Sequence, residues 1–389
     1  MQKLVAVVIC GAALVVTTVA AADPPIALPA LTKAARRLSG IDARLRIHVV
    51  YENAAGMRAQ AARVVDHGYP PDQQAYDETL YRALGLLAAG ESLRPALLRE
   101  TTNVLALYDP VTQALYVRNG RNVKSAVIHE LVHALQDEAF DLRRLSSLRR
   151  RSRDAAAAAD AAVEGDATFA TRRDGWTASS TSGDTASPLD SFLELEREFP
   201  HATGLRFIAT LHNLGGNRAV FSALRTFPTT TKQVFHIDTF LIGEEPVPVE
   251  LPAAAGAFSL VRSDTFGELD VRALLATFRV SGLERAADGW AGGRTALYRD
   301  ANGAEAVVVG LTWKTAADAA QWAEAVAIYV NEAFDAASPG FPTAVPCAAT
   351  LCWTVAGRSI AFARDGARSA VGFGPSVADA ATLARLVAR

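Results

Sequence analysis

One stretch of the sequence decides how its N-terminal part folds: Ser125-Ala126-Val127-Ile128-His129-Glu130-Leu131-Val132-His133-Ala134-Leu135. Its apolar flanks predict a buried helix over about residues 123–140. Residues four apart lie on one face of a helix, so His129 and His133 project side by side and can share one zinc ion. Glu130 points to the same side but is offset from the metal, which is the position of a general base that reaches a metal-bound water.

A third ligand is expected, because catalytic zinc usually keeps three protein ligands and one open position. A second helix, predicted over about residues 153–172, carries Glu164 on an Ala-rich face, 31 residues after the second histidine. This spacing suits an antiparallel helix that returns past the first one. Asp160 and Asp166 are rivals for the position, and otherwise suit a role in orienting an imidazole ring. The predicted zinc ligands are His129, His133 and Glu164.

The competing interpretation of this pattern is a chance match, with two structural histidines in a core helix and solvent-facing carboxylates in the next helix. The motif is short, and random matches to it occur. Its context argues for the metal site. The predicted helix follows a strand, has apolar flanks, and belongs to a chain that we expect to be exported.

The two segments together resemble the gluzincins, zinc peptidases whose metal is held by two histidines and one glutamate. The resemblance rests on His129-Glu130-Leu131-Val132-His133 and on Val163-Glu164-Gly165-Asp166-Ala167-Thr168. It implies zinc as the cofactor, peptide-bond hydrolysis as the reaction, and a peptide or protein as the substrate. The sequence departs from the gluzincin pattern at Thr168, where an Asp often stands four residues after the Glu. Support for a ligating histidine is then expected elsewhere, with Asp166 as the candidate.

More narrowly, the chain is similar to a family of largely uncharacterised exported bacterial proteins with a His-Glu-Leu-x-His-Ala-Leu-Gln-Asp core. The similarity covers about residues 84–322. The matching segments are His129 to Asp137, Phe140-Asp141-Leu142, Val163 to Thr168, Tyr108-Asp109-Pro110 and Trp290-Ala291-Gly292-Gly293-Arg294. Among them, only the zinc motif has a known chemical meaning.

A zinc peptidase also needs a donor for the oxyanion that forms during hydrolysis. The resemblance directs attention to Gln233-Val234-Phe235-His236, and His236 is the predicted catalytic donor, with His201 and Tyr108 as alternatives. Peptides commonly pair with an edge strand of the domain that binds them. The strand nearest the zinc helix in the sequence is 114–117, so we expect it to be the edge strand that lines the cleft.

Residues 1–22 have the composition of a signal peptide. Lys3 precedes an apolar run from Leu4 to Val19, and Ala20-Ala21-Ala22 supplies the small residues that a signal peptidase reads. The run is short for a membrane span. We therefore expect cleavage, no membrane anchor afterwards, and an exported protein that is periplasmic or secreted.

Cysteine use agrees with export. Cleavage removes Cys10 and leaves Cys347 and Cys352, five positions apart. In an oxidising compartment this pair is expected to form a disulfide across a tight turn. Two thiols are too few for a structural zinc site, so metal binding depends on histidine and carboxylate groups.

The composition is that of a globular chain with 389 residues, of which 50% are hydrophobic and 21% are charged. The net charge of -2 gives no reason to expect nucleic acid or an anionic membrane as a partner. The length allows two domains. We place a zinc-peptidase-like domain at residues 23–249 and a smaller domain at 250–389, joined by a proline-containing linker at about 244–257. The expected fold class is α+β, with a mainly helical first domain that has a small mixed or antiparallel sheet.

Further elements are predicted from apolar periodicity and turn residues. Helices are expected at residues 31–38, 70–87, 204–214, 218–227, 269–278, 316–334 and 377–387. Strands are expected at residues 45–51, 104–108, 114–117, 295–299, 304–313, 351–356 and 358–364. Residues 174–187 are rich in Ser, Thr, Gly and Ala and are expected to form a flexible loop.

These observations predict an exported zinc peptidase in which Glu130 is the general base. Nucleophilic hydrolases and nucleotide enzymes fit poorly, because the sequence has no Gly-x-Ser-x-Gly elbow and no Gly-rich phosphate loop after a strand. The alternative from another class is a non-catalytic zinc-binding protein of the cell envelope, with a binding or assembly role. Glu130 argues against it, since a structural zinc site needs no base and favours four protein ligands.

Overall fold

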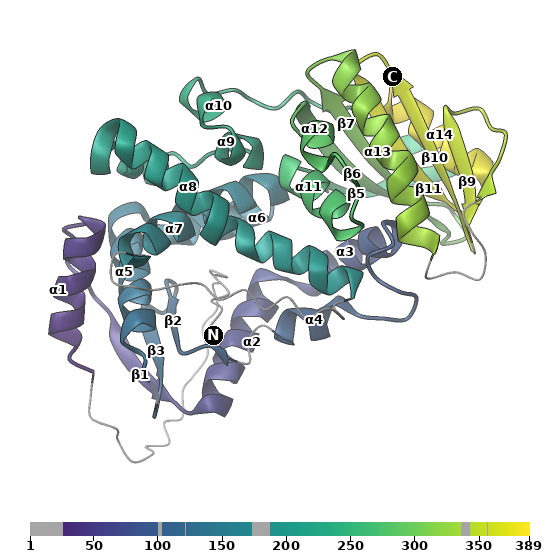
Figure 1. The fold of residues 1–389 in the computed structure, drawn as a ribbon. Coiled ribbons are helices and arrows are strands. Elements are labelled where there is room, and N and C mark those ends of the chain that lie inside the picture. Colours follow the sequence, from purple (N-terminus) through teal and green to yellow (C-terminus); the bar gives the residue numbers. More distant parts are fainter. Residues whose placement is uncertain (1–25, 100–102, 121, 173–186, 336–342, 356) are drawn as a thin grey trace.

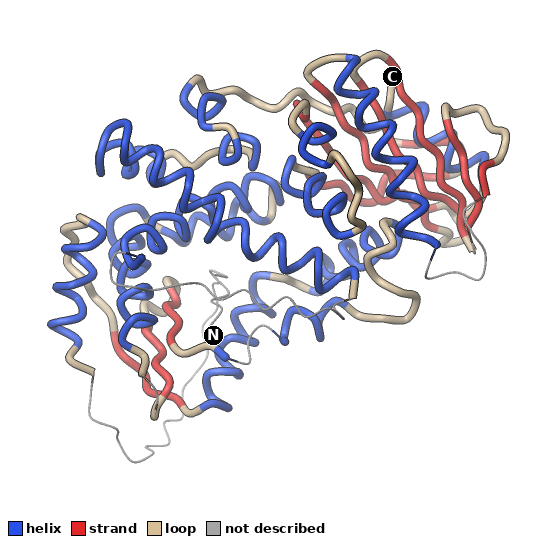
Figure 2. The backbone as a smooth tube through the Cα atoms, viewed as in Figure 1, coloured by secondary structure: helices blue, strands red, loops and turns tan. Residues whose placement is uncertain are grey.

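A computed structural model describes residues 26–389 except 100–102, 121, 173–186, 336–342 and 356. The expected α+β class is confirmed. Helices and a small sheet form the N-terminal part, and a larger sheet with helices on both faces forms the C-terminal part (Figures 1 and 2). The predicted signal peptide and nearly all of the predicted loop at 174–187 lie outside the described residues.

The N-terminal part is mostly helical. Its helices are α1 (Leu28–Ser39), α2 (Ala54–Gly68), α3 (Pro71–Ala83), α4 (Leu93–Arg99), α5 (Lys124–Phe140), η2 (Leu142–Arg144), α6 (Leu145–Arg149), α7 (Arg153–Arg172), α8 (Pro188–Arg225), α9 (Thr231–Phe235) and α10 (Ile237–Leu241). Its strands are β1 (His48–Glu52), β2 (Ala106–Asp109) and β3 (Ala114–Arg118). The helices predicted for the zinc motif and for Glu164 are confirmed as α5 and α7.

The C-terminal part is built on a sheet. Its strands are β4 (Ala254–Ala255), β5 (Phe258–Thr265), β6 (Trp290–Arg299), β7 (Glu305–Trp313), β8 (Thr343–Ala344), β9 (Leu351–Val355), β10 (Arg358–Asp365) and β11 (Arg368–Gly374). Its helices are α11 (Glu268–Thr277), α12 (Leu283–Ala287), α13 (Ala316–Asp335) and α14 (Val377–Val387).

The small sheet has the strand order β1-β3-β2, with β1 parallel and β2 antiparallel to β3. The expectation that residues 114–117 form an edge strand is wrong, because β3 is paired on both sides. Strand β1 comes from much earlier in the chain and occupies the side of β3 that a hairpin alone would leave free. Of the two strands in the predicted hairpin, β2 is therefore the one at the edge.

Helices α7 and α8 approach each other unusually closely. A methyl group added to Gly165 on α7 would lie under 3.0 Å from the backbone of Gly204 on α8, and one added to Gly204 would lie under 3.0 Å from Ala161 O. The two backbones therefore touch where a side chain would keep them apart. Glu164 and His201 are neighbours of these glycines in the sequence, so this contact fixes their relative positions.

Alternation of side chains places each face of the larger sheet against a different helix. All neighbouring pairs are antiparallel, in the order β4-β5-β6-β7-β11-β10-β9-β8. Val307, Val309 and Leu311 belong to the core on the side of α13, whereas Ala306 and Val308 belong to the core on the side of α14 (Figure 1). Three layers result, with the sheet in the middle.

Helix α3 precedes the zinc motif in the sequence but packs against the C-terminal sheet. Tyr76 OH on α3 lies 2.6 Å from Thr295 Oγ1 on β6, and Tyr329 OH on α13 donates to Leu84 O over 2.8 Å. Phe192, in the first half of α8, belongs to the same hydrophobic core. This core therefore includes residues from both sides of the boundary predicted between residues 249 and 250. The division into two domains stays a prediction.

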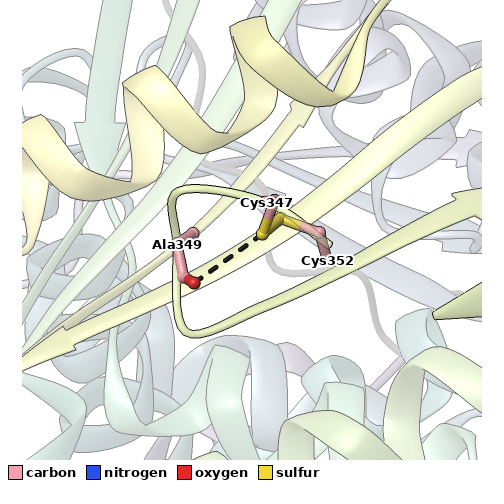
Figure 3. Close-up of a disulfide and its surroundings, with 3 residues drawn as sticks. All are labelled: Cys347, Ala349 and Cys352. Atoms are coloured by element: carbon pink, nitrogen blue, oxygen red, sulfur yellow. Dashed lines mark hydrogen bonds between the residues drawn. A yellow bond between two sulfur atoms is a disulfide. The ribbon is translucent and has the colours of Figure 1, made fainter. Parts of the chain in front are cut away.

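Cys347 and Cys352 form the predicted disulfide, which closes the turn before β9 (Figure 3). Cys347 Sγ also lies 3.7 Å from Ala349 O, inside the loop that the disulfide closes. Such a pairing is compatible with an oxidising, exported setting. Across the part of the chain that the structure describes, no helix combines the length and apolarity needed to cross a membrane.

The close contact of α7 and α8 gives a first prediction. Gly204→Ala should lower the free energy of unfolding by about 1–3 kcal/mol, because the new methyl group overlaps the α7 backbone. The urea midpoint of unfolding measures this effect. Gly90→Ala is the control, because its methyl group meets no atom within 4 Å and only its positive φ of 81° carries a cost. A Gly204→Ala midpoint above that of Gly90→Ala would contradict the role of the contact.

Candidate metal centre

The three predicted ligands come together at one point between α5 and α7. His129 Nε2 lies 3.1 Å from His133 Nε2 and 3.2 Å from Glu164 Oε2, and His133 Nε2 lies 3.3 Å from the same oxygen. All three side chains are buried. They form a cluster of ligand atoms that could hold a metal ion. We call His129, His133 and Glu164 the triad.

The spacing of the triad fits a tetrahedral metal site. With metal–ligand bonds of about 2.0–2.1 Å, neighbouring ligand atoms of a tetrahedron lie about 3.3 Å apart. The three measured separations, 3.1, 3.2 and 3.3 Å, match one face of such a tetrahedron. Hydrogen bonds alone cannot explain the cluster, because ring protons cannot satisfy all three contacts at once. A cation in the centre would satisfy them together.

The charges of the triad also favour a bound cation. Burial lowers the pKa of His129 to about 4, so that its ring is neutral and suited to binding a metal. Burial also disfavours the charged forms of the other two groups, but their mutual attraction outweighs it. The negative charge of Glu164 raises the pKa of His133, and the positive charge of His133 together with hydrogen bonds lowers the pKa of Glu164 well below its usual value. The buried carboxylate therefore keeps a positive charge beside it, a role that a metal ion can also fill.

The other ring nitrogen of each histidine has its own support. Gln136 Nε2 donates to Asp166 Oδ2 over 2.7 Å and to Val163 O over 3.1 Å, so the amide oxygen of Gln136 must face His133. His133 Nδ1, 2.9 Å from that oxygen, is then the donor, and Nε2 is free to bind a metal. Asp166 thus supports His133 as expected, but only through Gln136, which the sequence did not single out.

His129 is held in a similar way by Thr171 near the end of α7. Thr171 Oγ1 donates to Ala167 O over 2.8 Å and faces His129 Nδ1 at 3.5 Å, where it can accept the ring proton. Thr168, which stands where gluzincins often have Asp, instead contacts His201 Nδ1 at 3.3 Å. The sequence missed Thr171, although its position two helical turns after Glu164 was a usable signal.

Glu130 is buried next to the triad but contributes no atom to it. Its Oε2 accepts a hydrogen bond of 2.8 Å from Tyr108 N on the edge strand β2. Its Oε1 accepts no hydrogen bond from any described residue. Burial raises the pKa of Glu130 to about 8, because the apolar surroundings disfavour the charged form. A pKa of about 8 keeps this carboxyl mostly protonated at neutral pH, and a cation held by the triad would lower the pKa and leave the carboxylate, whose Oε1 could then take a proton.

The other residues that the sequence singled out, Asp160, Tyr108 and His201, each have different partners. Asp160, the rival ligand, has both carboxylate oxygens within 2.9 Å of Arg149 Nη2, so its charge is already paired. Tyr108 OH donates to Asp137 Oδ2 over 2.9 Å, which fixes β2 to α5. His201 lies beside the triad, with Nδ1 3.7 Å from Glu164 Oε2.

His236, the predicted catalytic donor, belongs to a second group of possible ligand atoms with Glu268 and Asp288. Its Nε2 lies 2.9 Å from Glu268 Oε1. Arg272 already pairs with both carboxylates, through Nε at 2.7 Å from Glu268 and through Nη2 to Asp288. A guanidinium therefore occupies the role of the cation here. The hydrogen bonds described for His236 do not reach the triad, so its catalytic role stays a prediction.

Comparison with known proteins covers only the C-terminal part. The family model described as "Domain of unknown function (DUF8575)" matches residues 258–384, from the start of β5 into α14. The triad lies outside the matched segment. No curated protein and no solved structure matches the chain.

The triad predicts which carboxylate is needed for metal binding. Glu164→Ala should reduce zinc content from about one ion per chain to near zero, because only two ligands remain. Asp160→Asn should keep the zinc, since Asp160 pairs with Arg149 and not with the triad. Mass spectrometry of metal content after dialysis measures both variants. Full zinc occupancy in Glu164→Ala would refute the ligand assignment.

The support of His133 gives a further prediction. Gln136→Leu should weaken zinc affinity about 10–100-fold. Without the acceptor for Nδ1, the ring of His133 is no longer held in one tautomer and one orientation. Competition with a zinc-binding dye gives the affinity. Gln74→Leu is a matched control, because the half-buried amide of Gln74 on α3 donates to Tyr69 O, and the change should leave the affinity unchanged. Equal affinities of the wild type and Gln136→Leu would show that the hydrogen bond between His133 Nδ1 and Gln136 does not matter for zinc binding.

Proposed function

We propose that the protein is an exported, zinc-dependent peptidase of the gluzincin type. The observation that carries the proposal is the convergence of two histidines and one glutamate within 3.1–3.3 Å, with a carboxylate on the same helix that is not a ligand. Three protein ligands with one position left open is the arrangement of catalytic zinc, whereas structural zinc usually has four.

The side chains around the triad suit hydrolysis of a peptide bond. Zinc held by His129, His133 and Glu164 would supply Lewis-acid polarisation of a carbonyl group and acidify water. Glu130 would take the proton from the attacking water on its free Oε1, while Tyr108 N holds the other oxygen in place. Because Glu130 and Tyr108 are both buried, little water is present to solvate the Glu130 carboxylate.

A cavity of about 310 Å³ borders the triad on the side of Glu164 and His201. We infer that the substrate enters from this cavity. Among the candidate donors, His201 is the one that shares the cavity with a triad residue, so it is better placed than His236 to face the substrate carbonyl. Its exposed fraction of 14% leaves the ring accessible from that side.

The second candidate function is a non-catalytic zinc-binding protein of the cell envelope. The observation that favours it is the deep burial of the base, because Glu130 is only 1% exposed. The available oxygen of Glu130 favours the enzyme, since a structural site gains nothing from an unpaired buried acceptor. In either case the predicted signal peptide and the disulfide support a periplasmic or secreted location.

Glu130→Gln separates the two functions. The amide keeps the size of the side chain but cannot accept the proton, so kcat for peptide hydrolysis should fall by about 10²–10⁴-fold with little change in KM. Zinc content should stay at the wild-type level, because Glu130 is not a member of the triad. Hydrolysis of a peptide library and metal analysis measure the two effects.

Glu138→Gln is the matched control, because Glu138 lies on the exposed side of the same helix. It should leave both quantities unchanged. Loss of zinc from Glu130→Gln would make Glu130 a ligand, and unchanged hydrolysis would place the chemistry elsewhere. A wild-type protein that binds zinc and cleaves no peptide would favour the non-catalytic function.

A further inference from the structure

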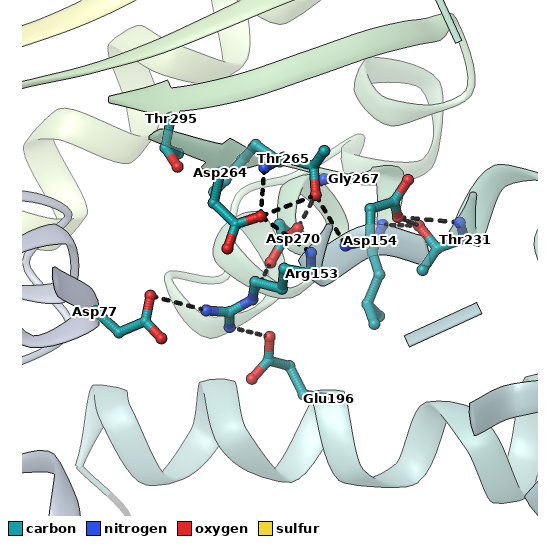
Figure 4. Close-up of polar contacts among 12 residues, drawn as sticks. Asp77, Arg153, Asp154, Glu196, Thr231, Asp264, Thr265, Gly267, Asp270 and Thr295 are labelled. Carbon is teal, nitrogen blue, oxygen red and sulfur yellow. Dashed lines mark hydrogen bonds and ion pairs between the residues drawn. The ribbon is translucent and has the colours of Figure 1, made fainter. Parts of the chain in front are cut away.

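Several buried carboxylates near the zinc helices tie one element of the fold to another. Arg153 at the start of α7 pairs with Asp77 on α3, Glu196 on α8 and Asp270 on α11 (Figure 4). These groups satisfy one another, so their role is structural. Asp137, in the last turn of α5, differs from them, because its partner is the tyrosine whose backbone holds the proposed general base.

That tyrosine, Tyr108, is attached to α5 at two points. Its backbone N–H donates to Glu130 Oε2 over 2.8 Å, and its OH donates to Asp137 Oδ2 over 2.9 Å. Burial raises the pKa of the Tyr108 phenol, so the OH stays protonated and is the donor. Seven residues, or about two turns of helix, separate Glu130 from Asp137, so both carboxyl groups lie on the same face of α5.

The N–H of Tyr108 can hold Glu130 because β2 is an edge strand. Leu105 O accepts from Arg118 N on β3 over 2.8 Å. Backbone groups alternate in direction along a strand, so those of Tyr108, three residues later, point away from β3. The ladder of the sheet therefore does not use this N–H. On its free side, the four-residue strand β2 is held by the Glu130 and Asp137 side chains.

Asp137 is itself fixed by the turn that follows α5. Its Oδ1 accepts from Leu142 N over 2.8 Å, while its Oδ2 accepts from Tyr108. The chain turns at Asp141, whose positive φ of 55° ends the helix. Asp137 and Tyr108 are each only 7% exposed. Because little water reaches them, loss of either partner would leave a buried polar group unsatisfied.

We propose that Asp137 is a positioning residue for the general base. Through the Tyr108 hydroxyl it holds the Tyr108 N–H in the place where this N–H binds Glu130 Oε2 and stops the carboxylate from turning. Asp137 contributes no atom to the triad, so it acts only through Tyr108 and Glu130. The inference rests on the proposed peptidase function, in which Glu130 takes a proton. A displacement of about 1 Å in such a group can lower a rate about 100-fold.

The competing interpretation is that Asp137 only stabilises the turn after α5. Its loss would then lower the stability of the fold, but the effect on the rate would not depend on Glu130. Two measurements distinguish these interpretations, one of strand position and one of kinetics.

Hydrogen exchange tests the position of β2 without reference to activity. The chain has eight tyrosines, so tyrosine-selective ¹⁵N labelling gives a simple amide spectrum, in which the Tyr108 signal is the one missing from Tyr108→Phe. In the zinc-loaded protein, Asp137→Leu should speed exchange of the Tyr108 amide at least about tenfold, because β2 loses one of its two attachments to α5. Asp137→Asn should stay within about threefold of the wild-type rate, since an amide can accept from the hydroxyl or donate to it.

Tyr329→Phe is the matched control for a general loss of stability. It removes a buried hydroxyl that donates to Leu84 O over 2.8 Å in the C-terminal part of the structure. Exchange of the Tyr108 amide should stay at the wild-type rate in this variant. Equal acceleration in Tyr329→Phe and Asp137→Leu would assign the effect to global stability and overturn the inference.

A double-variant cycle tests whether the effect passes through Glu130. Tyr108→Phe removes only the hydroxyl, and it should lower kcat for peptide hydrolysis at least about tenfold, with little change in KM or zinc content. In the Glu130→Gln background the same change should lower the residual kcat less than about twofold, because no base is left to position. Equal effects of Tyr108→Phe in the two backgrounds would contradict the positioning role.

The outcomes separate the inference from the function on which it rests. Unchanged exchange of the Tyr108 amide in folded Asp137→Leu would overturn the inference, whether or not the protein cleaves peptides. Faster exchange together with a wild-type kcat in Tyr108→Phe would keep the peptidase and reject the positioning role. Faster exchange, with no cleavage by the zinc-loaded wild type, would support the placement of the Tyr108 N–H by Asp137 and reject the peptidase.

Discussion

The contact between the backbones of α7 and α8 is the constraint on which the rest of the structure depends. Gly165 and Gly204 leave no room for a side chain between the two helices. Glu164 and His201 flank this contact, so the ligand from α7 and the imidazole from α8 are held at a fixed separation. The same two helices carry Arg153 and Glu196 at the other end of the cavity. One packing contact therefore sets both the metal centre and the ion pair between Arg153 and Glu196.

The sequence predicted the chemistry of the triad better than its surroundings. His129 and His133 follow from helical spacing, because residues on one helix face have a fixed geometry. Glu164 follows from its place on the Ala-rich face of a second helix that was expected to pack against the first. Gln136 and Thr171 were missed because their roles depend on where α7 lies relative to α5, which no local pattern records. The preference for His236 came from a resemblance, and the structure instead brings His201 near the triad. That choice required the position of α8, whose first half was not predicted.

The fold shows the same limit. Helices α5, α7, α13 and α14 were predicted within a few residues, because long amphipathic or apolar segments carry a clear period. The order β1-β3-β2 was not predictable, since it depends on pairing between strands far apart in the chain. Strands β5 and β11 were also missed. Each is bordered by strands or turns of similar composition, so only the partner strands identify them.

Helix α8 has a consequence for how the molecule can be divided. Its first half, with Phe192, lies in the core shared with α3 and the large sheet, while its second half, with Ile208 and Leu211, lies in the core around the zinc helices. A fragment that ends at the predicted boundary would keep α8 but lose the surface that covers Phe192 and Tyr76. Such a fragment would expose a contiguous apolar face and tend to aggregate. The two parts of the chain are thus expected to unfold together, as one cooperative unit joined by a single helix.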